Sequence, residues 1–311
     1  MSTVGVRSGA ESALYRWLCR THRSPHRALR RVHPHLWSAL SRLARGPLRA
    51  EMYGLPLWVP VGDRRPLWAA EIASLGTPIV AAVHLARVAR GRPVAVVDVG
   101  AAVGDTAALV LQRCPGEVGR LVCIEGHPDF FRLLTRNLDD HLRPAARGVV
   151  FAAVHALLAE EDTEVPALLE GVHAGTAAVG GGALVRAVPL DDVLPGGAPI
   201  DVLKVDTDGF DGRILAGARR TLVAEQPVVV FEWSPIQYAD LGSDLLQPFE
   251  VLVACGYGRF LLYSKEGRYV GEVDGTDVDR LRELAAGFEA TRGRGDDYVD
   301  VLALPPDTCC T

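Results

Sequence analysis

The sequence is poor in lysine, in aromatic residues and in long apolar runs. Lys204 and Lys265 are the two lysines among 33 basic residues, a bias that reflects codon usage in a GC-rich genome rather than chemistry. Aromatic residues make up 6% of the chain, which argues against a protein that stacks nucleic-acid bases. No run of about 18 uncharged apolar residues and no signal-peptide pattern occurs, so no segment is expected to cross a membrane. We therefore expect a soluble, cytoplasmic protein.

Cysteine spacing and net charge exclude further classes of protein. The six cysteines form no Cys-x-x-Cys pair and have no histidine at metal-ligand spacing, so neither a zinc ribbon nor a disulfide framework is supported. The formal net charge of −5 gives no overall positive field, which disfavours general binding to nucleic acid or to an anionic membrane.

Residues 1–50 form a basic arm that departs from this average. The arm has a net charge of +9, whereas residues 51–311 sum to −14. Its apolar residues recur at near-helical intervals, which predicts a helical arm that packs on the acidic body or on a second subunit as a homo-oligomer. Contact of the arm with RNA, acidic lipid or an acidic partner stays an alternative.

From residue 94 onward, short β-branched runs alternate with amphipathic stretches. This alternation predicts an α/β fold, a seven-stranded, mostly parallel sheet with helices on both faces. The first five runs are almost entirely apolar, as expected for strands that are buried on both faces. The predicted strands are 94–99, 120–124, 149–154, 201–205, 228–231, 258–263 and 298–304. The predicted helices are 105–113, 129–142, 211–224, 241–255 and 277–289.

The pattern divides the chain into two parts. Residues 1–90 are predicted to form an N-terminal helical arm or cap, with an extended or hairpin segment at 54–61 and helix at 66–90. Residues 91–311 are predicted to form the sheet domain. Within it, the glycine-rich segment 160–190 lacks a sustained period, and we interpret it as an excursion that faces the substrate.

A glycine turn between the first predicted strand and helix is the strongest local signal. Gly100 and Gly104 flank Ala101 and Ala102, at the place where a parallel sheet binds ligands beyond its strand ends. The turn lacks the G-x-G-x-x-G fingerprint, which disfavours a loop that grips a pyrophosphate. Taken alone, it is equally consistent with a tight packing turn.

Glu125 ends the second predicted strand, about 20 residues beyond the turn, where an acid reaches the hydroxyls of a ribose. A single nucleoside without a pyrophosphate loop favours S-adenosylmethionine over a nicotinamide cofactor. The alternative for Glu125 is an acid at the entry of the next helix. His127 either shapes this turn or borders the adenosine.

Three further acids follow neighbouring strands and are expected to converge at the sheet edge. Asp206, Asp208 and Glu232 are the candidate catalytic residues. One of them would act as a general base toward a hydroxyl. Alternatively, Asp206 and Glu232 would hold Mg²⁺ or Mn²⁺, which lowers the pKa of the hydroxyl.

Taken in order, the motifs resemble those of the FkbM family of S-adenosylmethionine-dependent methyltransferases. The matching segments are 98–106 (DVGAAVGDT), 124–128 (IEGHP), 188–193 (VPLDDV), 201–209 (DVLKVDTDG) and 217–218 followed by 231–232. The resemblance implies a class I, Rossmann-like methyltransferase fold and transfer to hydroxyl groups of natural products and sugars. Three positions depart from the family pattern, namely Ala102, Gly126 and Asp208.

The resemblance also assigns the cofactor site. It places Asp98 and the glycine turn beside the methionine and ribose, Glu125 on the ribose, and Asp206 by the methyl group. His155 and Ala156, after the third strand, fall where such folds contact adenine, and a structural histidine is the equal alternative for His155. The predicted cofactor residues are Asp98, Gly100, Ala101, Gly104, Asp105, Thr106, Glu125, Gly126, His127, His155, Ala156 and Asp206.

These inferences predict an O-methyltransferase that acts on a hydroxyl of a small molecule, such as a sugar or a secondary metabolite in natural-product or antibiotic biosynthesis. A non-catalytic adenosyl-binding protein is one alternative. An RNA-modifying methyltransferase that uses the basic arm is another, although nucleic acid is not the expected partner.

Overall fold

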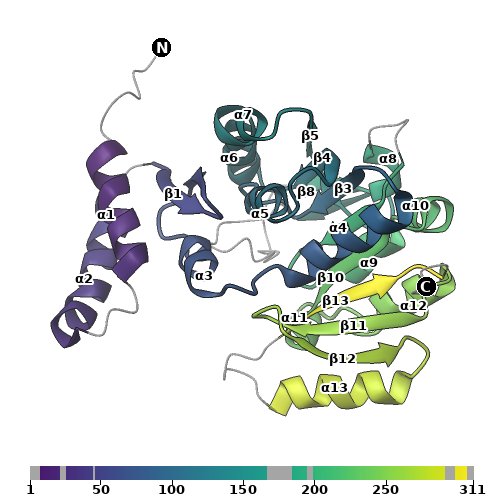
Figure 1. The fold of residues 1–311 in the computed structure, drawn as a ribbon. Coiled ribbons are helices and arrows are strands. Elements are labelled where there is room, and N and C mark those ends of the chain that lie inside the picture. The colour runs from purple at the N-terminus through teal and green to yellow at the C-terminus, as the bar shows by residue number, and fades with distance from the viewer. Residues whose placement is uncertain are drawn as a thin grey trace.

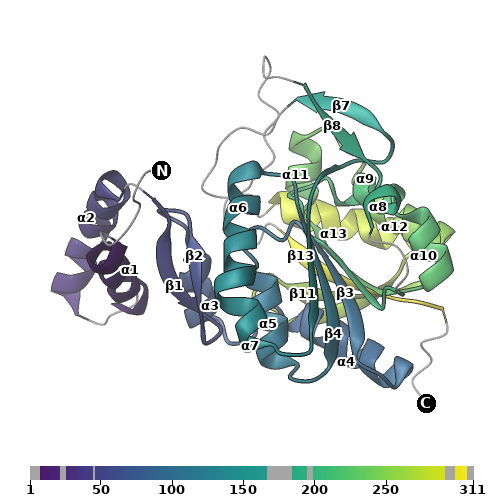
Figure 2. The same ribbon diagram turned by 90° about the horizontal axis from the view of Figure 1, so that it is seen from above.

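An eight-stranded sheet forms the centre of the molecule (Figures 1 and 2). The computed structural model describes residues 8–21, 26–44, 46–166, 184–194, 199–290 and 298–306. The strand order is β12-β11-β13-β10-β9-β3-β4-β5, and the five strands from β10 to β5 are parallel. Their bounds are β3 (Val94–Val99), β4 (Val118–Glu125), β5 (Val150–His155), β9 (Val202–Val205), β10 (Val228–Trp233), β11 (Arg259–Ser264), β12 (Tyr269–Asp274) and β13 (Val299–Leu304).

The predicted α/β fold with a mostly parallel sheet is confirmed, and all seven predicted strands are present. The sheet has eight strands rather than seven because β12 pairs with β11 as an antiparallel edge strand. Only Val273 is buried in β12, so this strand lacks the apolar run that identified the others.

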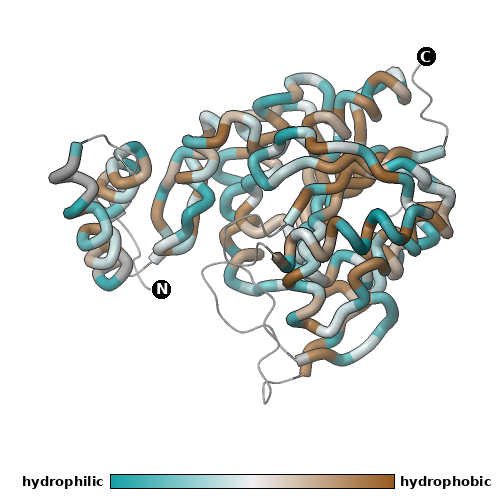
Figure 3. The backbone as a smooth tube through the Cα atoms, turned by 90° about the horizontal axis from the view of Figure 1, so that it is seen from below, coloured by the Kyte–Doolittle hydropathy of each residue, from teal (hydrophilic) through white to brown (hydrophobic). Residues whose placement is uncertain are grey.

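Helices cover both faces of the sheet, and alternate residues of each strand face one layer or the other. In β3, Val94 and Val96 belong to one core with α4 (Thr77–Arg90), α5 (Asp105–Arg113) and α6 (Pro128–Asn137). Val97 and Val99 belong to a second core with α9 (Asp211–Ala216), α12 (Gln247–Ala254) and α13 (Val278–Ala290). Hydrophobic segments accordingly gather in the sheet body (Figure 3).

Several predicted helices are shorter or divided. In the segment predicted as a helix at 129–142, α6 ends at Asn137. The chain continues as a π-helical turn, η1 (Leu138–Leu142), and then as α7 (Arg143–Ala145). The segment predicted as 211–224 is divided into α9 and α10 (Arg219–Glu225). The break lies at Gly217, where a Cβ atom would come within 2.3 Å of the backbone oxygen of Ala159. A separate short helix, α11 (Pro235–Asp240), precedes α12.

The N-terminal helices lie to one side of the sheet (Figures 1 and 2). They are α1 (Ser8–Thr21) and α2 (Arg27–Leu43), followed by the hairpin β1 (Leu48–Met52) and β2 (Leu55–Val59) and by α3 (Arg65–Glu71). Tyr15 and Leu18 of α1 are fully buried in the core shared with the hairpin, so α1 packs on its own chain. Helix α4, which falls within the predicted cap 1–90, packs on the main sheet.

A small third sheet flanks the predicted excursion at 160–190. Its order is β6-β8-β7, with β6 (Leu157–Leu158), β7 (Thr163–Pro166) and β8 (Leu184–Val188), and α8 (Leu190–Val193) follows. Residues 167–183 of the excursion lie outside the described residues. In the part of the chain that is described, no helix combines the length and the apolar character that a membrane crossing requires.

Candidate active site

The carboxyl ends of the parallel strands bring the predicted site residues to one edge of the sheet. Asp98 is the penultimate residue of β3, Glu125 ends β4, and His155 ends β5 opposite Glu125. Asp206 directly follows β9, and Glu232 is the penultimate residue of β10. Ligands of parallel α/β sheets bind beyond this edge.

The glycine turn joins β3 to α5 and closes against the neighbouring strands. The backbone amides of Gly100 and Ala101 both donate to the carbonyl oxygen of Ile124, at 3.0 Å each. Gly100 has a φ of +77°, and a Cβ atom there would lie 2.0 Å from the backbone oxygen of Asp206. Only glycine fits this position, because both the left-handed backbone and the close approach exclude a side chain.

Glu125 is buried, and both of its carboxylate oxygens are held by the backbone. Oε2 accepts from the amide of Ala102 at 2.8 Å, and Oε1 accepts from the amide of His127 at 2.7 Å. Burial raises the pKa of Glu125, while these two amides oppose the rise. A carboxylate has about four acceptor positions, so two remain for further donors such as ribose hydroxyls.

Lys204 joins two predicted site carboxylates. Its Nζ lies 3.2 Å from Oδ1 of Asp98 and 3.0 Å from Oδ2 of Asp206. Desolvation disfavours the ammonium, but the two carboxylates outweigh it and raise the pKa of Lys204. Burial raises the pKa of Asp98 to about 6 despite this partner. Oδ2 of Asp98 is buried and has no hydrogen-bond partner among the described residues, so it can accept a hydrogen bond from a ligand.

The residues around β4 and β5 have mainly structural contacts. Nδ1 of His127 accepts from the amide of Asp129 at 3.2 Å and so caps α6, which supports its role in shaping the turn. The His155 ring stacks on Phe131 with centroids 4.8 Å apart, and its Nε2 lies 3.1 Å from the carbonyl oxygen of Gly126. Contact of His155 and Ala156 with adenine stays a prediction.

Asp105 is paired with an arginine that sequence reasoning did not identify. Nη1 of Arg65 lies 3.2 Å from Oδ1 of Asp105, and its Nε also bonds the fully buried Asp63. The hydroxyl of Tyr15 in turn donates to the carbonyl oxygen of Asp63. This network connects α1 to the start of α5. The following residue, Thr106, is half-buried in the first turn of α5.

The carboxylates after β9 and β10 form a larger acidic cluster than the sequence predicts. Besides Asp208 and Glu232, the cluster contains Asp211, which begins α9, and Asp300. Asp300 is the direct partner of Glu232 in the pairing of β10 with β13. Desolvation, followed by the charge of Asp206, raises the pKa of each of these groups. The pKa values are about 7 for Asp208, about 8 for Asp211 and about 7 for Asp300, and that of Glu232 lies well above its usual range. A lone acid in the apolar run 299–304 is the signal that would have identified Asp300.

Metal binding by Asp206 and Glu232 stays a prediction. Among the residues that the structure describes, no three histidine, cysteine, aspartate or glutamate side chains group closely enough to hold one metal ion.

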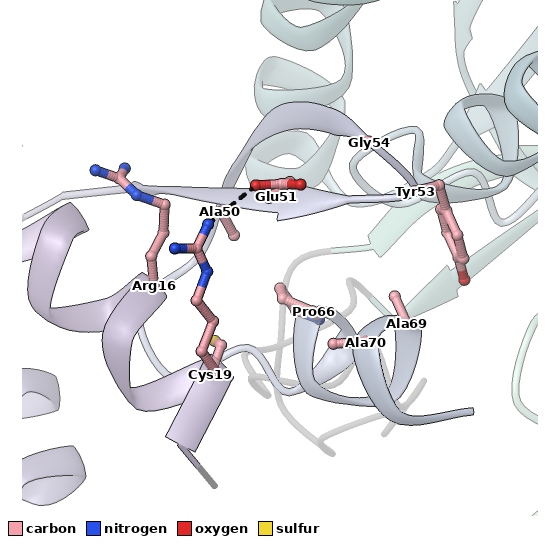
Figure 4. A pocket seen from close by; sticks show the side chains of 10 residues that line it. Arg16, Cys19, Ala50, Glu51, Tyr53, Gly54, Pro66, Ala69 and Ala70 are labelled. Atoms are coloured by element: carbon pink, nitrogen blue, oxygen red, sulfur yellow. Dashed lines mark hydrogen bonds and ion pairs between the residues drawn. The ribbon is translucent and has the colours of Figure 1, made fainter. Parts of the chain in front are cut away.

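A pocket of about 260 Å³ lies between α1, the β1–β2 hairpin and α3 (Figure 4). Arg16, Cys19 and Arg20 of α1 line one side of it, and Glu51 of β1 forms an ion pair with Arg20 at 3.4 Å. None of its lining residues belongs to the predicted cofactor or catalytic set.

The raised pKa values predict that the protein loses stability as the pH rises. Aspartate in an unfolded chain has a pKa of about 3.9, so from about pH 4 to about pH 8 the folded state binds more protons than the unfolded state. The free energy of unfolding should therefore fall across this window, as urea denaturation at about pH 5 and about pH 8 would measure. Asp300→Asn should reduce the fall, because it removes one group whose pKa is raised to about 7. The exposed Asp192→Asn serves as the control, and a stability that rises with pH would contradict the prediction.

Comparison with known proteins agrees with this geometry. The FkbM methyltransferase domain model matches residues 98–258, more than half of the chain. No curated protein matches significantly. Solved structures with similar folds include an FkbM methyltransferase from Methylobacillus flagellatus, with 18% identity, a TM-score of 0.42 and coverage of 67% of this chain and 43% of that one. The precorrin-6y C5,15-methyltransferase from Geobacter metallireducens has 14% identity, a TM-score of 0.37 and coverage of 76% and 91%.

A third structure is TYW2 from M. jannaschii in complex with AdoMet, with 12% identity, a TM-score of 0.36 and coverage of 84% of this chain and 87% of that one. Of the M. flagellatus protein, the chain spans less than half the length. The family model covers the glycine turn, Glu125 and Lys204. It also covers Asp206 and Asp208 after β9, and Glu232 near the end of β10. The chain belongs to the FkbM family of S-adenosylmethionine-dependent methyltransferases.

Proposed function

We propose that the protein methylates a hydroxyl group of a small molecule, such as a sugar or a secondary metabolite. The observation that carries the proposal is that a solvent-exposed carboxylate, Asp206, lies at the same sheet edge as Asp98 and Glu125, two of the predicted cofactor residues. Asp206 directly follows β9, its side chain is 45% exposed, and it shares Lys204 with Asp98 of the predicted cofactor site.

The described residues fit S-adenosylmethionine. Glu125 has two free acceptor positions for the two ribose hydroxyls. The unpartnered Oδ2 of Asp98 suits the ammonium group of the methionine part, because a buried acceptor without a donor is unfavourable. When bound, the cofactor supplies a methyl group on a sulfonium, which is transferred by in-line displacement.

The chain's own contribution is to align the acceptor and to remove its proton. As the acceptor oxygen takes up the methyl group, its hydroxyl proton would pass to a carboxylate of the chain, and S-adenosylhomocysteine would be the other product. Asp206 suits this role because it directly follows β9 and its side chain is 45% exposed, so the hydroxyl of a bound acceptor can reach it. Alignment of the reacting atoms contributes independently of this base.

Removal of metal ions separates the two mechanisms that the sequence leaves open. If a carboxylate acts as the base, methyl transfer after treatment with EDTA should equal that of the untreated protein. Dependence on added Mg²⁺ or Mn²⁺, restored by the ion after chelation, would instead support a metal held by Asp206 and Glu232. Binding of S-adenosylhomocysteine in both samples serves as the control for an intact cofactor site.

Calorimetric titration of S-adenosylhomocysteine into the full chain tests the cofactor binding on which the proposal depends. Micromolar binding is expected. Absence of binding by folded protein would contradict the proposal and direct the search to dinucleotides and nucleotide sugars. An Asp206→Asn variant that binds the cofactor but loses methyl transfer would distinguish an enzyme from a non-catalytic adenosyl-binding protein.

A further inference from the structure

Within the described part of the chain, the acidic edge of the sheet holds more carboxyl groups than it has cations to pair with them. Glu232 and Asp300 are direct partners in the antiparallel pairing of β10 with β13, so both side chains lie on the same face. Asp206 and Asp208 follow β9, the next strand on the other side of β10. Like charges directly opposite each other destabilise a sheet, so this pairing needs a compensating partner.

Lys204 does not provide that compensation for the whole cluster. Its ammonium is already shared between Asp98 and Asp206. Asp208 has a single neutral donor, Nε2 of Gln237 at 3.4 Å. Within the described part of the chain, neither Glu232 nor Asp300 has a side-chain hydrogen bond or ion pair.

Unpartnered buried oxygens are an independent sign that a donor is missing. Asp211 is fully buried, and its Oδ2 accepts from Oγ1 of Thr207 at 3.1 Å and from the amide of Gly209 at 3.3 Å. Among the described residues, its Oδ1 has no hydrogen-bond partner, and neither has Oε1 of Gln237, whose amide nitrogen bonds Asp208. The hydrogen bond from the amide of Gly209, the residue after Asp208, places the Asp211 carboxylate beside the same loop.

The spacing of the acids favours an organic cation over a metal ion. A divalent ion needs several oxygens at about 2–2.6 Å, and no three acidic side chains of the described residues converge in that way. A protonated amine differs because its three N–H groups point in different directions and so satisfy carboxylates that lie apart.

We propose that the methyl acceptor is an amino sugar or a similarly small aminated polyol, whose protonated amine binds between Asp208, Glu232 and Asp300. The inference rests on the proposed O-methyltransferase function and names the class of its acceptor. The amine anchors the acceptor on the β10–β13 side of the edge, while a hydroxyl of the same molecule faces Asp206. Charge-assisted hydrogen bonds of this kind are the stronger ones in proteins.

Binding of matched sugars to the full chain, saturated with S-adenosylhomocysteine, tests the inference. The probes are methyl 2-amino-2-deoxyglucoside, its N-acetyl derivative and methyl glucoside, at a pH where the amine is protonated. We expect the amine to bind at least tenfold more tightly than either neutral sugar, a difference of about 1.4 kcal/mol. Asp300→Asn should reduce that preference while S-adenosylhomocysteine still binds as in the wild type.

Each other outcome is decisive. Equal binding of the three sugars, tighter binding of a neutral sugar, or no binding of the amine at about 10 mM would overturn the inference and leave the cofactor assignment intact. A preference for the amine that Asp300→Asn leaves unchanged would overturn the assigned position of the amine. Failure of the wild type to bind S-adenosylhomocysteine would contradict the proposed function itself, before any sugar is added.

Discussion

Glu125→Ala should weaken the binding of S-adenosylhomocysteine at least tenfold, or by about 1.4 kcal/mol. The substitution removes the two acceptor positions that are free for ribose hydroxyls, and hydrogen bonds to a charged group each contribute about 1.5–3 kcal/mol. It also releases the amides of Ala102 and His127, which hold the glycine turn and the start of α6 in place. Calorimetric titration of wild type and variant, at a temperature where both are folded, measures the effect.

Glu117→Ala is the matched control for this experiment. Glu117 precedes the same strand, β4, at its opposite end, where it pairs with Nδ1 of His84 at 2.6 Å. The Glu117→Ala variant should bind S-adenosylhomocysteine as the wild type does. Thermal unfolding without ligand separates loss of the ribose contacts from loss of the turn. An affinity that Glu125→Ala leaves within about twofold of the wild type would remove the ribose assignment.

The sheet could be predicted from the sequence because its strands are buried on both faces. In β3 and β9 every residue is buried, so the apolar runs are continuous. The edge strand β12 could not be predicted in this way, since its residues other than Val273 are partly or fully exposed. The break between α9 and α10 also escaped prediction. It depends on the approach of Gly217 to Ala159, a contact between segments far apart in the sequence.

The gathering of the predicted cofactor residues at one sheet edge could be predicted for a related reason. Glu125, Asp98 and Asp206 stand at the ends of parallel strands, and the carboxyl ends of such strands meet at one edge. Asp300 enters the same edge from β13, whose antiparallel direction is not evident from an apolar run alone. Arg65 lies 40 positions before its partner Asp105, so their ion pair depends on tertiary packing.

The contacts of Lys204 explain why a lysine stands in an otherwise apolar strand. Its neighbours in β9 are all buried, and its own side chain is 11% exposed. Without the ammonium, Asp98 would be a buried carboxylate with no cation, near the carboxylate of Asp206. A buried charge that loses its partner is strongly destabilising. Lys204 therefore supports both the fold and the charge of Asp98.

Lys204→Met should lower the free energy of unfolding by about 3–5 kcal/mol, as urea denaturation at neutral pH would measure. Lys265→Met replaces the chain's other lysine and should change stability by less than about 0.5 kcal/mol. Asp98→Asn in the Lys204→Met background should recover part of the loss, because it removes the carboxylate left without a cation. If both lysine variants lose stability equally, or if Asp98→Asn deepens the loss, the ion pair is not what holds this strand end together.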